Sequence, residues 1–118
     1  MTHNFRKLKI WKEGIIITSE TYKITRTFPD FERFGLRSQM NRCAVSIPSN
    51  IAEGSSKSTD RHFGNYLENS LGSAFEWETQ LIVAFNENYI GEGIFKDFEN
   101  RIQQLQKMIS RFKGGLDK

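Results

Sequence analysis

The spacing of apolar residues constrains the fold of this 118-residue chain more than any other feature. In four separate segments, apolar side chains recur at alternating intervals of three and four residues, which is the pattern of one helical face. No segment shows the sustained alternation of apolar and polar residues that is typical of a strand. The sequence therefore predicts an all-α protein, an antiparallel up-down four-helix bundle.

The expected helices are separated by short segments rich in helix-breaking residues. Pro29 ends the first helix, and Asp30 after it is a candidate N-cap for the second. Gly54 and the following serines end the second helix, and the pair Gly114 and Gly115 ends the fourth. We expect the helices at about residues 8–26, 36–53, 60–88 and 98–113. Because no flexible linker divides them, residues 1–118 are expected to form a single domain.

The segment SIPSNIAEG, residues 46–54, places a proline inside the second expected helix. The piece between Pro48 and Gly54 is too short to be a useful helix of its own. We therefore expect the helix to run through Pro48 with a kink. Since proline has no amide hydrogen, the carbonyl oxygen of Ala44, four residues earlier, needs water or another donor.

Polar side chains gather on one side of this second helix. At about 100° per residue, five of them fall close together. They are Gln39, Arg42, Ser46, Asn50 and Glu53. One interpretation is a solvated face; the other is a hydrogen-bonded polar seam that fixes helix register or subunit geometry.

Two of the expected helices carry more apolar surface than a lone bundle requires. In the first helix, Ile10, Ile17 and Ile24 recur every seven residues, away from the apolar face that carries Ile15 and Tyr22. In the third helix, apolar residues cover about half of the circumference. Because a monomer would expose such patches, we expect a homo-oligomer; the alternative is a monomer with a broad core. The residues assigned to the interface are Ile10, Ile17, Ile24, Phe75 and Ile82.

Positive charge is concentrated in the first half of the chain. Residues 1–61 hold eleven basic and six acidic side chains, whereas residues 62–118 hold six and eight, for a net charge of +3. Long cationic side chains can contact phosphate groups, which makes the basic residues of the first half candidates for nucleic-acid binding. The alternative is that they only solvate helix faces. The candidates are Lys9, Lys12, Lys23, Arg26, Arg33, Arg37, Lys57 and Arg61.

No residue pattern predicts an enzyme, a metal site or a cofactor. The histidines His3 and His62 stand apart from any other metal-ligating residue. The GEG at residues 91–93 lacks the preceding strand of a dinucleotide-binding loop. Cys43 lies on the apolar face of its helix, as a core residue does more often than a nucleophile. We expect a non-enzymatic protein.

The chain also lacks the features of a secreted or membrane protein. Its N-terminal segment has no apolar core of the kind found in signal peptides, and no run of about eighteen apolar residues could span a membrane. With a single cysteine, an intramolecular disulfide is impossible. We therefore expect a cytoplasmic protein that does not associate with membranes.

Several stretches together resemble a known family. They are FRKLKIWK at residues 5–12, FPDFERFGLRSQM at 28–40 and SIPSNIAEG at 46–54, and the segments LGSAFEWETQL at 71–81 and NYIGEG at 88–93 fit as well. Over nearly its whole length the chain resembles the four-helix-bundle proteins encoded in intervening sequences of bacterial 23S ribosomal RNA genes. The resemblance implies a protomer that assembles as a ring, a pentamer, without enzyme activity.

The resemblance also implies possible partners. Similarity to the accessory proteins of diversity-generating retroelements implies a basic ring that binds RNA or DNA and a reverse transcriptase. The favoured hypothesis is an oligomeric module that binds ribosomal RNA or other nucleic acid. The alternative is a protein-interaction scaffold, or a reverse-transcriptase accessory protein with little nucleic-acid affinity of its own.

Overall fold

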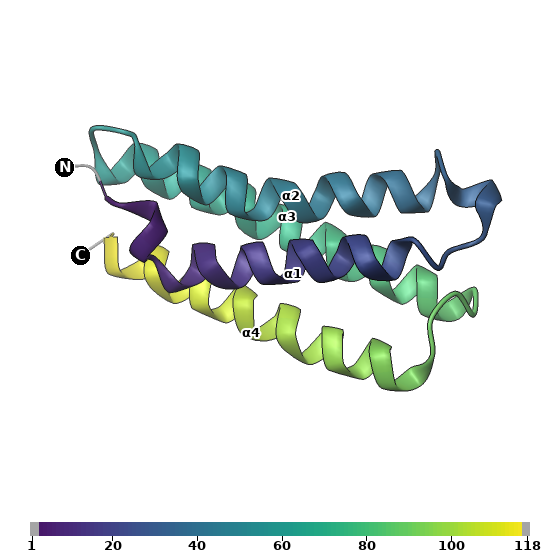
Figure 1. Cartoon of the computed structure of the whole chain (residues 1–118). Helices are drawn as coiled ribbons and strands as arrows, with labels where there is room; N and C mark the ends of the chain where they lie inside the picture. Colours follow the sequence, from purple (N-terminus) through teal and green to yellow (C-terminus); the bar gives the residue numbers. More distant parts are fainter. Residues whose placement is uncertain (1–2, 117–118) are drawn as a thin grey trace.

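The computed structural model describes residues 3–116 and confirms the all-α up-down bundle. Within that range the chain forms four long helices and two short 3₁₀ helices (Figure 1). They are η1 (Phe5–Lys7), α1 (Lys9–Thr25), η2 (Asp30–Glu32), α2 (Leu36–Ser55), α3 (Asp60–Asn86) and α4 (Glu92–Leu116). The bundle measures 45 × 24 × 20 Å. No helix of this part of the chain is both long and apolar enough to cross a bilayer.

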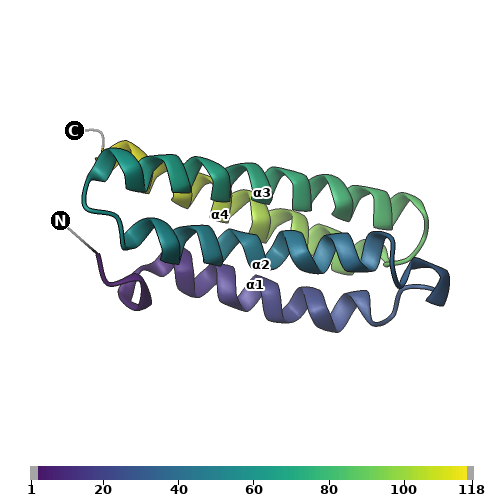
Figure 2. The same ribbon diagram turned by 90° about the horizontal axis from the view of Figure 1, so that it is seen from above.

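The helices pack in the order of the chain. α1 packs on α2, α2 on α3 and α3 on α4, and α1 closes the bundle against α4 (Figures 1 and 2). Near its centre the Trp77 side chain of α3 is fully buried, and its Nε1 donates a hydrogen bond to Thr21 Oγ1 of α1 at 3.1 Å. This bond gives the indole N–H a partner inside the core, as a buried tryptophan requires.

The structure partly reverses the expected orientation of the first helix, although Leu8 and Trp11, also expected on the core face, do pack against the core. Ile10 and Ile17 are 4% and 1% exposed and belong to the protomer's own core, and Ile24 packs against that core. Ile15 and Tyr22, which the apolar spacing assigned to a core face, are exposed instead. The prediction that the Ile10 line forms an oligomer interface was therefore wrong for the two buried isoleucines.

Polar and small residues explain this reversal. The buried face of α1 also contains Gly14, Thr21 and Thr25, which a count of apolar positions does not include. Thr21 Oγ1 donates to the carbonyl oxygen of Ile17 at 2.6 Å, and Thr25 Oγ1 donates to Asn41 Oδ1 of α2 at 2.7 Å. Because their hydroxyls are satisfied, these threonines can be buried at little cost.

Helix α2 continues without interruption through Pro48. The carbonyl oxygen of Ala44, which Pro48 leaves without its usual amide donor, accepts a hydrogen bond from Thr18 Oγ1 of α1 at 3.0 Å. The expectation that this carbonyl finds another donor is therefore confirmed. α1 approaches closely here, because a Cβ at Gly14 would lie only 3.2 Å from Pro48 Cβ.

Several helix ends differ from the predicted ones. α2 includes Gly54, which is buried because α3 packs tightly against it, rather than forming a turn. α4 begins at Glu92, six residues before the expected start, and continues through Gly114 and Gly115. Asp30 begins the short helix η2 and does not cap α2; the Glu32 carboxylate does, accepting from the Leu36 amide at 2.9 Å.

Candidate nucleic-acid interface

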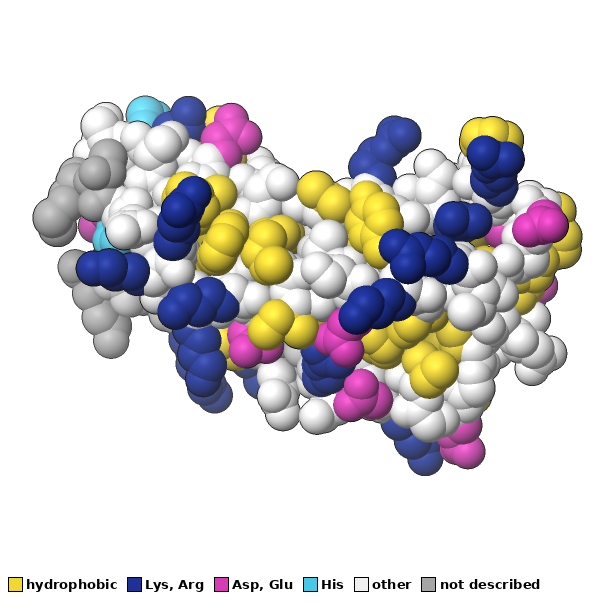
Figure 3. Space-filling model, in the orientation of Figure 1, with side chains coloured by type: hydrophobic (Ala, Val, Ile, Leu, Met, Phe, Trp, Pro, Cys, Tyr) yellow, Lys and Arg dark blue, Asp and Glu magenta, His cyan; other side chains and the backbone are white. Residues whose placement is uncertain are grey.

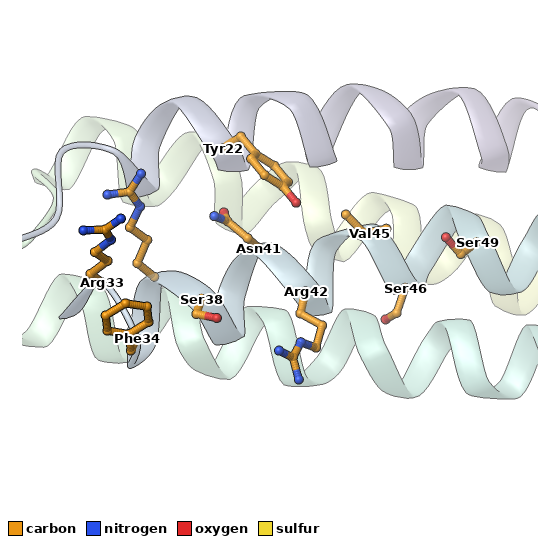
Figure 4. A pocket seen from close by; sticks show the side chains of 10 residues that line it. Tyr22, Arg33, Phe34, Ser38, Asn41, Arg42, Val45, Ser46 and Ser49 are labelled. Atoms are coloured by element: carbon orange, nitrogen blue, oxygen red, sulfur yellow. The ribbon is translucent and has the colours of Figure 1, made fainter.

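A groove with a volume of about 720 Å³ lies along the outer side of α2, where α2 faces the end of α1 (Figure 4). We call it the arginine groove. Tyr22 reaches into it from α1, and the other lining residues come from the turn before α2 and from α2 itself. Those residues are Arg33, Phe34, Arg37, Ser38, Asn41, Arg42, Val45, Ser46 and Ser49.

The charged residues that line this groove are all positive. Arg33, Arg37 and Arg42 contribute guanidinium groups, and no Asp or Glu is among the lining residues. Within residues 3–116, none of the three forms an ion pair. Arg33 lies over the ring of Phe34, with its guanidinium carbon 5.3 Å from the ring centroid. The groove therefore presents positive charge that the described part of the protomer does not neutralise.

The acidic residue nearest to this cluster in sequence, Glu32, is engaged elsewhere. Its Oε1 caps α2 at Leu36, and its Oε2 accepts from the hydroxyl of Tyr89 at 2.9 Å. Partial burial and this bond to Glu32 raise the pKa of Tyr89. A Cβ at Gly35 would lie 2.5 Å from Glu32 Oε1, so glycine leaves the space that the capping carboxylate occupies. The turn before α2 thus directs its carboxylate into the protein and leaves Arg33 exposed.

The eight predicted cations fall into two groups rather than one stripe. Antiparallel packing of α1 and α2 brings Lys23, Arg26, Arg33 and Arg37 to one end of the bundle, and Lys9, Lys12, Lys57 and Arg61 towards the other. In Figure 3, Lys and Arg side chains lie towards both ends of the face, with apolar and acidic side chains between them. Of these eight residues, only Arg33 and Arg37 line the arginine groove.

Arg42 is the cation of the groove that sequence reasoning placed elsewhere. It was grouped with the polar stripe of α2, but it lies at the edge that joins the arginine groove to a second depression between α2 and α3. A usable signal was present, because Phe34, Ser38, Arg42 and Val45 follow one another at helical spacing on the outer side of α2.

The polar stripe lies on the flank of α2 that faces α3. Ser46 Oγ donates to the carbonyl oxygen of Cys43 and Asn50 Nδ2 donates to that of Ser46, each at 2.8 Å. Glu53 Oε2 accepts from the hydroxyl of Tyr66 on α3 at 3.4 Å. Gln39 is exposed and lines the depression between α2 and α3. The stripe is therefore partly a seam, with one bond between helices and two within α2.

The depression between α2 and α3 differs from the arginine groove in charge. It contains Glu76 opposite Arg42, and Cys43 opens onto it. Cys43 Sγ has two acceptors within reach of its single hydrogen, the carbonyl oxygen of Ser73 at 3.0 Å and Glu76 Oε1 at 3.4 Å. Burial, together with the bond to Glu76, raises the pKa of Cys43 to about 12. The side chain is a neutral thiol at physiological pH, as in a core cysteine.

The other predicted interface residues are exposed on α3. Phe75 and Ile82 are 52% and 39% exposed, and Val83 beside them is 43% exposed. They therefore remain available to a second subunit, unlike Ile10 and Ile17. Among residues 3–116, no three His, Cys, Asp or Glu side chains are grouped so that they could hold a metal ion.

Comparison with known proteins gives a family match and a structural match. The family model described as "23S rRNA-intervening sequence protein" matches residues 6–111. A crystal structure of a protein of unknown function from the S23 ribosomal protein family of Bacteroides thetaiotaomicron VPI-5482 is similar, with a TM-score of 0.82. The two chains are 19% identical, and the match covers 89% of this chain and 95% of the other. At that identity the likeness shows the fold alone. No curated protein sequence matches this chain.

Proposed function

Because the chain belongs to the 23S rRNA-intervening sequence protein family, we propose that it is a non-enzymatic, oligomeric module that binds nucleic acid, with structured RNA as the preferred ligand. The observation that carries the proposal is the arginine groove, whose lining includes three arginines and no carboxylate. Guanidinium groups suit phosphate because their planar N–H donors match its oxygens in pairs. A groove of this composition favours a polyanion over an uncharged or basic partner.

Self-association supports binding by repeating this groove. A single protomer offers few cationic contacts and has a net charge of only +3. In a closed ring the same contacts recur at each subunit, so weak sites act together on one RNA. We propose a ring of five, the number that the resemblance to ring-forming proteins implies, with the exposed α3 residues Phe75 and Ile82 in the contact between subunits.

A bend of α2 at Pro48 is part of this proposal. Proline removes one helical hydrogen bond, and its ring crowds the carbonyl oxygen four residues earlier, which bends most helices that contain it. The Thr18 bond to Ala44 supports the idea, because it supplies the displaced carbonyl with a donor from the neighbouring helix. Such a bend changes the direction in which the first half of α2 presents Arg37 and Arg42.

Binding of a labelled ribosomal RNA fragment at low and moderate salt tests the proposed function. We expect the double variant Arg37→Glu/Arg42→Glu to lose at least tenfold in affinity, since each reversal replaces an attraction to phosphate with a repulsion. The matched control Lys96→Glu/Lys107→Glu makes the same charge change on exposed positions of α4 and is expected to lose much less. Equal losses in the two variants would remove the groove from the binding site.

The second candidate function is a protein-interaction scaffold or an accessory subunit of a reverse transcriptase. It is favoured by the exposed apolar side chains, including Ile15, Ile16 and Phe75, which resemble an interface between proteins more than a phosphate-binding surface. No binding of RNA by the wild-type protein, even at low salt, would leave this candidate ahead.

A further inference from the structure

Phe34, which lines the arginine groove, is 87% exposed. Phe31, three residues earlier, is 77% exposed but lies edge-on to the ring of Tyr89 and does not line the groove. Burying a phenylalanine side chain stabilises a folded protein, so this exposure forgoes a contribution to folding. A bulky apolar ring that remains in solvent on the rim of a cationic groove points to a ligand that covers it.

The exposure does not result from a loose connection between α1 and α2. Backbone hydrogen bonds from Arg33 N to Asp30 O and from Gly35 N to Glu32 O, both at 3.0 Å, fold this segment into tight turns. The Glu32 carboxylate bonds to both Leu36 and Tyr89 and fixes the segment to the bundle. The turn therefore holds Phe34 at the rim of the groove in a defined place.

The groups around Phe34 suit the base, the phosphate and the sugar of a nucleotide. Arg33 lies over the ring, with its guanidinium carbon 5.3 Å from the ring centroid, and Tyr22 reaches across from α1 (Figure 4). Asn41 Oδ1 accepts from Thr25, which leaves the Asn41 amide N–H groups as donors at the groove. Hydroxyl groups of Ser38, Ser46 and Ser49 line the same surface. The groove thus combines an aromatic ring for a base, cations for phosphates, and neutral donors and acceptors for sugar or base edges.

On the premise of the function proposed above, we propose that the arginine groove binds a single-stranded stretch of nucleic acid, with a base stacked on Phe34 and phosphates against Arg37 and Arg42. Only an unstacked base can lie against an aromatic side chain, because the bases of a duplex already stack on their neighbours. Arg37 and Arg42 both line the groove. They lie five residues apart, about 7.5 Å along the helix axis and about 140° around it, so a strand in the groove would meet them with different phosphates. In a structured RNA, the ligand is a loop, a bulge or an end.

The competing occupant is an acidic protein segment. It would satisfy the three arginines, but it gives no reason for an exposed aromatic ring to be held beside them. Stacking on Phe34 accounts for the ring and for the cations together. A base-dependent contribution of Phe34 therefore distinguishes the two ligands.

The test compares a labelled single-stranded RNA with a duplex of the same length at one salt concentration, by fluorescence anisotropy. We expect the wild type to bind the single strand more tightly. Phe34→Ala should weaken binding of the single strand by about 5- to 150-fold, the equivalent of one stacked base, and leave binding of the duplex unchanged. Phe34→Trp should retain the wild-type affinity for the single strand. Because the Phe34 side chain is so exposed, these substitutions should leave the thermal midpoint of the protein unchanged.

The outcomes separate this inference from the proposed function. If Arg37→Glu weakens binding but Phe34→Ala changes neither ligand, the protein binds nucleic acid through phosphates alone and the single-strand proposal is overturned. If no RNA binds at low salt, both proposals fail. If poly-glutamate displaces the single strand and binds Phe34→Ala as well as wild type, the groove takes an acidic protein segment, which also overturns the inference.

Discussion

Because Gly54 has no side chain, α2 and α3 lie closer together here than a larger residue would allow. A Cβ at this position would lie 2.6 Å from Tyr66 Cβ, an atom fixed to the α3 backbone, and 2.9 Å from Phe63 Cδ1. We expect Gly54→Ala to lower the free energy of unfolding by about 1–3 kcal/mol, as overpacking does. This loss should outweigh the gain in helix propensity, which is about 1 kcal/mol.

Urea denaturation checks this prediction, with Gly72→Ala as the matched control. Gly72 also lies within a helix, but a Cβ there would meet nothing within 4 Å. Its replacement should raise stability by about 0.5–1 kcal/mol. If both substitutions stabilise the protein, the contact between α2 and α3 is looser than described.

Thr18 acts through the carbonyl oxygen that Pro48 leaves unpaired. Its hydroxyl lies within bonding distance of Ala44 O, at 3.0 Å, and of Gly14 O, at 2.7 Å. Thr18→Val keeps the shape but removes the donor, so we expect a loss of about 1–3 kcal/mol, the cost of a buried polar group without a partner. Thr79→Val is the control, because the bond that it removes, from Thr79 Oγ1 to Phe75 O, lies on an exposed helix surface. We expect it to change the free energy of unfolding by no more than about 0.5 kcal/mol. A similar small effect at both positions would contradict the role assigned to Thr18.

At the scale of whole helices, α1 and α4 are joined by a polar contact. Arg101 of α4 donates to Glu20 of α1 and also pairs with Asp97, one turn before it on α4. The side chains of Arg101 and Glu20 are 25% and 37% exposed, so solvent screens the pair in part. The hydrogen bond to Arg101 is the main cause that lowers the pKa of Glu20.

Arg101→Gln should therefore lower the free energy of unfolding at pH 7 by at most about 1 kcal/mol. Since the folded state lowers the pKa of Glu20, the pair with Arg101 stabilises the protein fully above the unfolded pKa of Glu20, which is about 4.3. This stabilisation is lost as the pH falls through the lower pKa of the folded state. The difference between wild type and variant should accordingly shrink below about pH 4. Lys96→Gln, which breaks the exposed pair with Glu92, is the control and should have a smaller effect. A difference that stays constant down to pH 2 would show that charge pairing is not its origin.

The helices themselves could be predicted, but some of their faces and ends could not. Helix α4 was recognised because its apolar residues form a single arc. Helix α1 carries two apolar lines, and the choice between them depended on Thr21 and Gly14, whose burial follows from contacts with Trp77 and Pro48 on other helices. Gly54 and Gly114 were interpreted as breaks because glycine is the residue most typical of helix ends. The sequence alone does not reveal that packing against α3 requires the first of them.

The candidate site was also predictable only in part, because contacts between helices bring its residues together. Arg33 and Arg37 stand out by charge, but their separation from Lys9 and Lys57 depends on the antiparallel packing of α1 and α2. The role of Glu32 as a cap was missed, because the side chain reaches Leu36 from a 3₁₀ turn that lies before the helix. That contact turns the Glu32 carboxylate away from the groove, where Arg33 is the charged residue of this segment.

At the scale of the whole molecule, the exposed apolar surface of α3 predicts self-association. Light scattering should give a mass close to five times 13.7 kDa. Phe75→Glu/Ile82→Glu should shift the protein towards the monomer, because a charge buried in a subunit contact is strongly unfavourable. Ile94→Glu, at an exposed position of α4, is the control and should keep the oligomer. A wild-type protein that is monomeric at all concentrations would contradict the ring.

The salt dependence of RNA binding tests the central claim, that the arginine groove holds phosphates, most directly. The logarithm of the association constant should fall linearly with the logarithm of salt concentration, by about 0.7 for each contacted phosphate of a single strand. Replacing Arg33, Arg37 and Arg42 by Gln should therefore reduce the slope by about 1.4 for each occupied groove, which corresponds to the two phosphates placed against Arg37 and Arg42. The variant Lys96→Gln/Lys107→Gln should leave the slope unchanged. A slope that is the same in wild type and in the triple variant would contradict the account.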